Sequence, residues 1–256
     1  MKRLLRIAHT EVLEHRRQPW MIFILAVNYA LWSALFGGMF FLVDRFAARP
    51  EDLAFLKQRM SEIGVQYETA LQLATSTFGS LTFTNLPLFV AIMSGTSVLH
   101  DRECGTMPFL MLAPVTRLQL LLGKLAGAMV IPLLCHVVFV GLSSLAIGQL
   151  AALAPYANTF GASPAWWVAF LIGAPASAAF VGALGTVISA LSRDVRTSMQ
   201  YTSFFIGLLS LGFGAVLVDG LTKGLALQVA FAMASIIAAV ITLTIGARLI
   251  SRDVTD

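Results

Sequence analysis

Residues 120–150 of the chain read LLLGKLAGAMVIPLLCHVVFVGLSSLAIGQL, an apolar run longer than one membrane crossing requires. A helix that spans the hydrocarbon core of a bilayer needs about 20 predominantly apolar residues. Of the 256 residues 58% are hydrophobic and 12% are charged, and soluble domains carry roughly 25% charged residues. The composition therefore predicts a polytopic membrane protein and excludes soluble globular, disordered and disulfide-stapled secreted chains.

Six segments are long and apolar enough to be transmembrane helices, which predicts an all-α integral membrane protein. They are residues 20–43, 78–99, 120–150, 166–191, 201–218 and 225–247. Lys124, near the start of the third segment, is counted with the flanking loop, and the six interiors otherwise contain no Asp, Glu, Lys or Arg. In the fourth segment small residues recur one helical turn apart, which predicts close helix packing. They are Gly173, Ser177 and Val181, then Ala174, Ala178 and Gly182, and then Gly185 and Ser189.

The distribution of basic residues predicts the orientation. Six spans place both termini on one side, and 12 of the 17 Lys and Arg residues lie on that side. Because basic residues are enriched in cytoplasmic loops, both termini are expected in the cytoplasm of a bacterial cell with the chain in its plasma (inner) membrane. The same excess accounts for the net charge of +4 without a nucleic-acid partner.

Residues 1–19 predict an amphipathic helix that lies on the inner leaflet. Its apolar side would hold Leu4, Leu5, Ile7, Ala8 and Val12. Its basic residues would face lipid phosphates, and they are Lys2, Arg3, Arg6, Arg16 and Arg17. A generic basic membrane anchor is the alternative interpretation.

Residues 44–77 predict an extracytoplasmic loop that contains a second amphipathic helix. From Glu51 to Leu71 apolar residues recur at steps of three or four, with charged residues between them. This helix would rest on the membrane or on a partner. Shielding of the span ends and docking of a periplasmic partner are both open.

Motifs for catalysis, metal binding and cofactor binding are absent from the sequence. No phosphate-binding loop precedes Lys124, and the four histidines are scattered. We therefore expect no catalytic residue, no metal and no cofactor on this chain. His136, inside the third span, is a candidate proton relay, and a neutral histidine that hydrogen-bonds a neighbouring helix is the alternative.

The segment between the second and third spans predicts a helix, a break, a short helix, a second break and a helix. Asp101 and Glu103 end the second span, where the helix dipole disfavours each anion by about 0.3–1 kcal/mol, so a cationic partner is expected. Gly105 suits a positive φ. The other expected signals are a Thr106 cap, Pro108 in the first turn of a helix over Met107–Ala113, a stop at Pro114, and a Thr116-x-x-Gln119 capping box.

The short apolar helix, with Phe109, Leu110 and Leu112, has two interpretations. It is either a helix that docks into a groove of a soluble partner or a plain connection between two spans. The residues alone leave both open.

The same segment resembles the hallmark of ABC-2 type permeases, the membrane subunits of ABC exporters. The resemblance comprises Glu103-x-Gly105-Thr106, Leu110 followed by Pro114-Val115-Thr116-Arg117, and Gly123-Lys124, and it extends to the topology of the whole chain. Two positions depart from the family pattern. Pro108 stands where the family more often has another residue, and Asp101 replaces a more frequent Glu.

The resemblance implies a permease that docks on a separate ATP-binding subunit, which would hold ATP and Mg. Two permease chains, identical or related, would work with two ATPase copies. The coupling residues would be Asp101, Arg102, Glu103, Gly105, Thr106, Phe109, Leu110, Leu112, Pro114, Thr116 and Arg117. A second cytoplasmic contact would comprise Arg193, Asp194 and Arg196. Arg6, Arg16 or Arg17 would supply the cation for Asp101 or Glu103.

The implied function is the export of an amphipathic, lipidic or peptide-like substrate, because the spans offer few fixed charges. One alternative is a mechanotransmitter that passes ATP-driven motion to a periplasmic partner. Another is a standalone secondary carrier, which the absence of ionisable residues from the span interiors disfavours.

Overall fold

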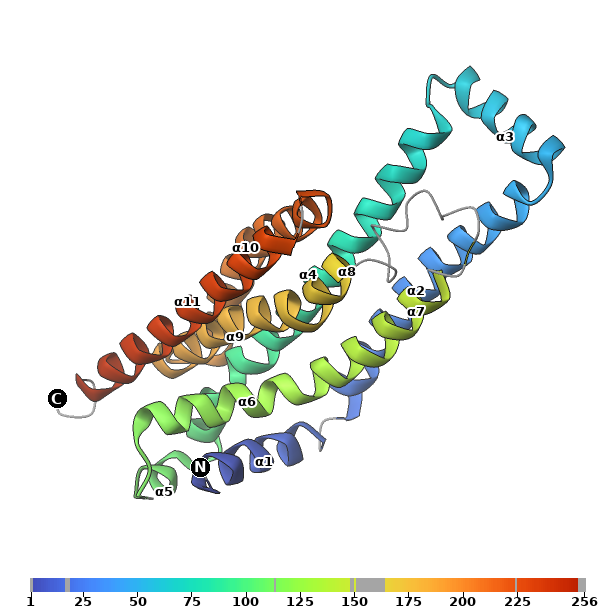
Figure 1. Cartoon of the computed structure of the whole chain (residues 1–256). Coiled ribbons are helices and arrows are strands. Elements are labelled where there is room, and N and C mark those ends of the chain that lie inside the picture. Colours follow the sequence, from blue (N-terminus) through green and yellow to red (C-terminus); the bar gives the residue numbers. More distant parts are fainter. Residues whose placement is uncertain are drawn as a thin grey trace.

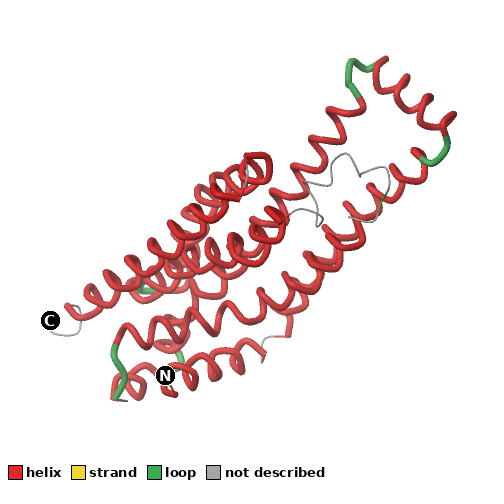
Figure 2. Tube along the Cα trace, viewed as in Figure 1, coloured by secondary structure: helices red, strands yellow, loops and turns green. Residues whose placement is uncertain are grey.

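The computed structural model describes residues 2–16, 19–112, 114–147, 150, 164–223 and 225–252. Every regular element among these residues is a helix (Figures 1 and 2). In chain order the elements are α1 (Lys2–Arg16), α2 (Pro19–Ala47), α3 (Pro50–Glu62), α4 (Tyr67–Glu103), α5 (Met107–Leu112), α6 (Arg117–Cys135), η1 (His136–Val140), α7 (Gly141–Ile147), α8 (Pro164–Val168), η3 (Ala169–Gly173), α9 (Ala174–Leu191), α10 (Val195–Lys223) and α11 (Leu225–Arg252).

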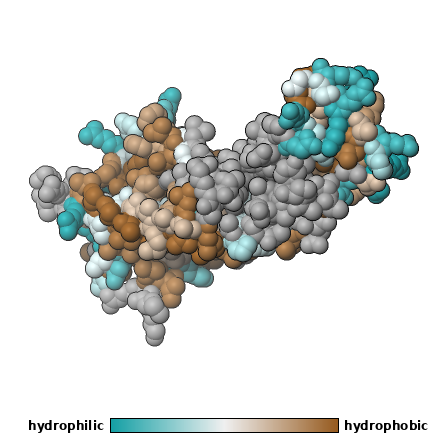
Figure 3. All heavy atoms as spheres, turned by 45° about the horizontal axis from the view of Figure 1, so that its top comes forward, coloured by the Kyte–Doolittle hydropathy of each residue, from teal (hydrophilic) through white to brown (hydrophobic). Residues whose placement is uncertain are grey.

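The long helices run side by side in an elongated bundle. Figure 1 places α1 and α5 at one end of this bundle and α3 at the opposite end, beyond the other helices. The visible surface of the bundle is largely apolar, and the α3 end is hydrophilic (Figure 3). A largely apolar surface is expected of a bundle that crosses a bilayer.

Five stretches are long and apolar enough to cross a membrane among the residues that could be searched. They are Ile22–Phe46, Phe83–Glu103, Arg117–Ala146, Trp166–Leu191 and Leu225–Ile250, and they match the first, second, third, fourth and sixth predicted spans. The fifth predicted span, residues 201–218, lies within α10 but is not among the five. The side chains of most α10 residues after Leu209 lie outside the described part of the chain.

The region between the first two spans differs from its prediction. The single helix expected from Glu51 to Leu71 is interrupted, because α3 ends before Gly64, whose φ of 75° is in the left-handed region. The chain then turns into α4. The ammonium of Lys57 on α3 lies 2.9 Å from the carboxylate of Glu68 on α4 and joins the two helices. The apolar stripe continued past Gly64, which is why periodicity alone missed the turn.

Small residues bring α9 close to α4, as their spacing predicted. A Cβ added to Gly185 would lie 2.5 Å from Oγ of Ser94 and 3.0 Å from the carbonyl oxygen of Ala91. The hydroxyl of Ser189 accepts hydrogen bonds from the backbone N–H groups of Val98 and Leu99 at 3.2 and 3.1 Å. The α4–α9 contact therefore forms the centre of the bundle.

Candidate functional site at the α1 and α5 end

The connection from α4 to α6 has the predicted alternation of helices and breaks. Gly105 has a φ of 69°, and α5 follows as a helix of six residues. Thr116 then caps α6. Its hydroxyl accepts the N–H of Gln119 at 3.2 Å, and its own N–H donates to the Gln119 side chain at 3.1 Å. The capping box is confirmed, and Ala113, the last residue of the expected short helix, lies outside the described residues.

Thr106 directly precedes α5, and its carbonyl oxygen accepts the backbone N–H of Leu110 at 3.1 Å. Its hydroxyl donates to the carbonyl oxygen of Asp101 and to the Asp101 carboxylate, both at 3.1 Å. The threonine therefore ties the start of α5 back to the end of α4. This bond restricts how far α5 can move independently of α4.

A buried ion cluster lies directly behind this turn. Nζ of Lys124 on α6 lies 2.5 Å from Oε2 of Glu11 on α1 and 2.7 Å from Oδ2 of Asp101 on α4. The side chains of Lys124, Glu11 and Asp101 are only 4%, 1% and 5% exposed. A third carboxylate, Oε2 of Glu14, lies 3.8 Å from the same ammonium. One lysine thus connects three helices and is surrounded by three acidic side chains.

This cluster corrects the expectation that an arginine of the first helix would pair with Asp101. The partner is Lys124, and Arg6 borders the adjacent groove without an ion pair among the described residues. The side chains of Arg16 and Arg17 lie outside the described part of the chain. Asp101 is buried, pairs with Lys124 inside this chain, and lines the groove that Arg6 borders.

Close contact with α6 holds α1 in place. A Cβ added to Gly123 would lie 2.7 Å from Cγ2 of Ile7, and one added to Gly127 would lie 2.9 Å from the carbonyl oxygen of Ala8. The apolar side of α1 was expected to lie on the membrane. Ile7 and Ala8 of that side face α6 instead, and Leu5 remains exposed. α1 is therefore packed against the bundle along one face.

Burial shifts the titration of two α1 side chains in this cluster. Desolvation raises the pKa of Glu11 to about 7, although the neighbouring Lys124 ammonium opposes the shift. Desolvation, helped by the same ammonium, lowers the pKa of His15 to about 4. Near neutral pH the imidazole of His15 is therefore uncharged, and Glu11 takes up a proton more readily than an exposed carboxylate does.

The second predicted cytoplasmic contact lies beside the first. The guanidinium of Arg102 donates to the carbonyl oxygens of Ser192 at 3.1 Å and Ala190 at 2.5 Å, at the end of α9. Asp194 caps α10 by accepting the N–H of Thr197 at 2.8 Å. This bond and the bond from the Thr197 hydroxyl lower the pKa of Asp194. The two turns are therefore joined through Arg102.

The surface of this end includes several of the predicted coupling residues. Leu112 is 83% exposed, whereas Leu110 is half-buried and packs against the core. The other predicted residues that the structure leaves exposed are Arg102, Glu103, Gly105, Thr106, Pro114, Thr116, Arg193, Asp194 and Arg196. Arg117 is half-buried, and the side chain of Phe109 lies outside the described residues. Of the two apolar tip residues whose side chains are described, Leu112 is exposed and Leu110 packs inward.

His136 lies away from this end, in a π-helical turn within the third span. Its ring is buried and stacks on Phe170 with the ring centroids 4.8 Å apart. Tyr29 meets it edge-on at 6.2 Å. The surroundings of the imidazole are thus mainly aromatic, and within the described residues no group of His, Cys, Asp and Glu has the geometry of a metal site.

The sequence alone did not identify Glu11, His15 and Lys124 as site residues. The sequence does contain a pattern that indicates them. Leu4, Ile7, Glu11 and His15 lie on one helical face of residues 1–19. An acidic side chain on a face that is buried needs a buried cation as its partner. Lys124 belongs to the family resemblance, but its place near the start of an apolar run predicts only a residue of the flanking loop.

Comparison with known proteins agrees with these features. A family model described as "ABC-2 family transporter protein" matches residues 5–238, which is most of the chain. No curated protein sequence matches the chain. In this family the membrane subunit typically lacks an ATPase domain and works with separate ATP-binding subunits. The protein is therefore a multi-pass membrane component that belongs to the ABC-2 family of transporter proteins.

Proposed function

We propose that this chain is the six-span permease subunit of an ATP-driven exporter, and that α5 and the turn at Ser192 receive the motion of an ATP-binding subunit. In this proposal both termini are cytoplasmic, two permease chains assemble with two ATPases, and the cargo is amphipathic, lipidic or peptide-like. The observation that carries the proposal is the buried cluster of Lys124, Glu11 and Asp101, which fastens the α5 turn to three helices.

A force applied to α5 has to reach the membrane helices to do work. Thr106 bonds α5 to the end of α4, and Asp101 bonds that end to Lys124 on α6. Arg102 extends the connection to the end of α9. Each of these links is buried or partly buried, so water competes for it less than at an exposed surface. A plain connecting loop needs none of these bonds, which favours a coupling role over a simple turn.

Co-purification tests the proposal. The tagged chain, expressed in its source cells and extracted in mild detergent, is expected to bring down a P-loop ATPase subunit. Leu112→Glu places a charge on the exposed tip of α5 and is expected to reduce ATPase recovery about tenfold, as loss of a central interface residue does. Ile63→Glu is the matched control, because Ile63 is 74% exposed and directly follows α3 at the opposite end of the molecule.

Transport by the purified chain without any nucleotide-hydrolysing partner would contradict the proposal. Equal ATPase recovery with Leu112→Glu and with the unaltered chain would contradict the docking surface on α5.

A second candidate is a mechanotransmitter, and α3 favours it. This helix lies beyond the bundle, and no described residue of α3 is buried. Replacement of residues 50–62 by a short flexible linker separates the two candidates. Loss of an outer partner with ATPase coupling intact supports transmission, whereas unchanged binding of outer proteins supports transport.

A further inference from the structure

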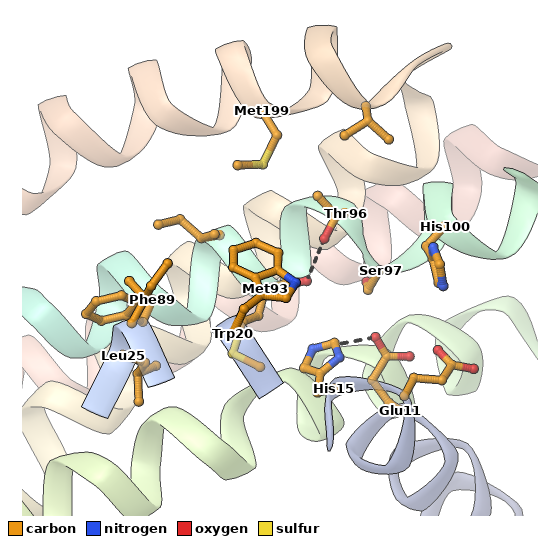
Figure 4. A pocket seen from close by; sticks show the side chains of 14 residues that line it. Glu11, His15, Trp20, Leu25, Phe89, Met93, Thr96, Ser97, His100 and Met199 are labelled. Carbon is orange, nitrogen blue, oxygen red and sulfur yellow. Dashed lines mark hydrogen bonds and ion pairs between the residues drawn. The ribbon is translucent and has the colours of Figure 1, made fainter. Parts of the chain in front are cut away.

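A cavity of about 390 Å³ lies between α1, the start of α2, α4 and α10 (Figure 4). Its volume is within the roughly 300–1,000 Å³ typical of small-molecule sites. One end is polar, with Glu11 and His15 side by side, and the rest is apolar, with Phe89 and Met93 on α4 and Met199 on α10. The cavity therefore has the shape and the two-part lining that an amphiphile requires.

The polar end has more acidic than basic groups. Glu11, Glu14 and Asp101 share the single ammonium of Lys124. Glu14 is the least well paired of the three, because its 3.8 Å separation from Lys124 is too long for a hydrogen bond. Its carboxylate is 30% exposed and lines the cavity, so it is accessible to a cationic group of a ligand.

Among the described residues near this end, no charged group other than Lys124 forms an ion pair with Glu14. His15 is uncharged at neutral pH because burial and Lys124 lower its pKa to about 4. His100 on α4 lines the cavity. Arg6 borders the neighbouring groove and makes no ion pair with Glu11 or Glu14 in the described part of the chain.

His15 provides an independent indication of a ligand. Its side chain is 8% exposed and lines the cavity, and Nε2 has no hydrogen-bond partner. The nearest carboxylate oxygen, Oε1 of Glu11, is 3.9 Å away. A buried polar atom without a partner is costly, so a ligand group that bonds to this nitrogen would gain free energy.

We propose that this cavity binds a compact cationic amphiphile, with a protonated amine between Glu14 and His15 and an apolar body against Phe89 and Met93. The inference rests on the proposed export function and narrows its cargo to amphiphiles of this charge. Trp20 lines the cavity and is exposed, so the cavity opens at the first turn of α2. An amphiphile could enter there, and the indole would favour a cation as it passes.

The charge of the site selects against other amphiphiles. A carboxylate or sulfate head would be repelled by Glu11 and Glu14. An alcohol would offer Glu14 only a neutral hydrogen bond. An ammonium donates to a carboxylate through a charge-assisted hydrogen bond, which is the strongest contact that this end of the cavity offers.

Photoaffinity labelling of the full chain in nanodiscs tests the proposal. The probe is decylamine with a diazirine on its tail, and matched probes have an alcohol or a carboxylate head. We expect saturable labelling of cavity peptides by the amine, about tenfold above either matched probe, as the loss of one charged hydrogen bond predicts. Equal labelling by all three probes would overturn the proposal.

Three variants localise the signal. Glu14→Gln removes the charge at constant size, and Thr96→Phe fills the apolar part of the cavity, which Thr96 lines. Each is expected to lower amine labelling about tenfold. Glu51→Gln is the matched control, because Glu51 is an exposed carboxylate on α3 that does not line the cavity. Amine labelling that neither Glu14→Gln nor Thr96→Phe reduces would overturn the assignment.

The lipid composition of the nanodiscs distinguishes the source of the amine. Competition by phosphatidylethanolamine, with phosphatidylglycerol as the reference lipid, would identify a lipid headgroup as the natural occupant. Unchanged labelling would identify a free amphiphile. Both results support the same amine chemistry.

Labelling needs no nucleotide, which separates this inference from the proposed function. Absence of labelling in a preparation that retains its ATPase refutes the cavity assignment alone. Saturable labelling of a chain that never associates with an ATPase refutes the export function alone.

Discussion

Nζ of Lys124 on α6 lies 2.5 Å from Oε2 of Glu11 on α1, and both side chains are almost fully buried. A buried ion pair is weak evidence for stability when compared with apolar residues of the same size, but removal of one partner leaves an uncompensated charge. In this chain the loss of Lys124 would leave two carboxylates, Glu11 and Asp101, without their cation. The pair therefore keeps α1 attached to the bundle as long as both members are present.

Lys124→Met is expected to lower the free energy of unfolding by about 3–5 kcal/mol, the typical cost of breaking a buried pair. Thermal unfolding in detergent measures the effect. Lys57→Met is the matched control, because Lys57 also lies 2.9 Å from a carboxylate but both partners are exposed. The control is expected to cost at most about 1 kcal/mol. Equal losses in the two variants would contradict the assignment of the cluster as a structural link.

The two shifted groups of α1 affect stability in opposite directions. The pKa of Glu11 rises from its ordinary 4.5 to about 7, so between these values the folded chain holds a proton that the unfolded chain has released. Stability from Glu11 therefore falls as pH rises. The pKa of His15 falls from 6.5 to about 4. In that range the unfolded chain binds the extra proton, and stability from His15 rises with pH.

His15→Gln is therefore expected to expose the Glu11 contribution. The variant should lose stability on the order of 2 kcal/mol between about pH 5 and about pH 7, whereas the unaltered chain should change less because the two effects oppose each other. Unfolding in detergent at several pH values measures the slope. The double variant with Glu11→Gln should have no such slope, and a slope that persists would assign the titration to another group.

Gly127→Ala is expected to loosen α1, because the added Cβ would lie 2.7 Å from Cγ of Glu11 and 2.9 Å from the Ala8 carbonyl oxygen. Overpacking of this kind costs about 1–3 kcal/mol. Hydrogen exchange of residues 2–16 should become faster, with little change in α9. Gly207→Ala is the control, since a Cβ at Gly207 meets nothing within 4 Å. Unchanged exchange in α1 would show that α1 does not need this close approach.

Gly105→Leu is expected to impair ATPase capture while membrane insertion stays intact. The φ of 69° at Gly105 costs a residue with a side chain about 1–2 kcal/mol, so the turn before α5 should rearrange. Gly105→Asn is the matched variant, because Asn tolerates this conformation better. Co-purification of the ATPase is the measurement. Normal capture by Gly105→Leu would argue against a role for this turn in docking.

Local signals predicted the loop between α4 and α6 well. Gly105, Thr116 and Gln119 act through their own backbone and near neighbours, so a sequence pattern is sufficient to identify them. The turn at Gly64 was missed because the apolar repeat continued on both sides of it. Gly64 itself could have indicated the turn, because glycine readily adopts a positive φ.

The ion cluster depends on helices that are far apart in the sequence. Neither the partner of Asp101 nor the burial of Glu11 follows from periodicity, because each depends on how α1, α4 and α6 pack. The nearest arginines were the natural candidates by charge, but Gly123 and Gly127 bring α1 so close to α6 that Lys124 is the cation within reach.

The guanidinium of Arg102 donates hydrogen bonds to the carbonyl oxygens of Ala190 and Ser192 at the end of α9. These bonds couple the amino-terminal and carboxy-terminal halves of the polypeptide. A subunit that pressed only on α5 would therefore also displace the α9–α10 corner. The load would thereby reach the carboxy-terminal helices directly from the end of α4, without passing through α6.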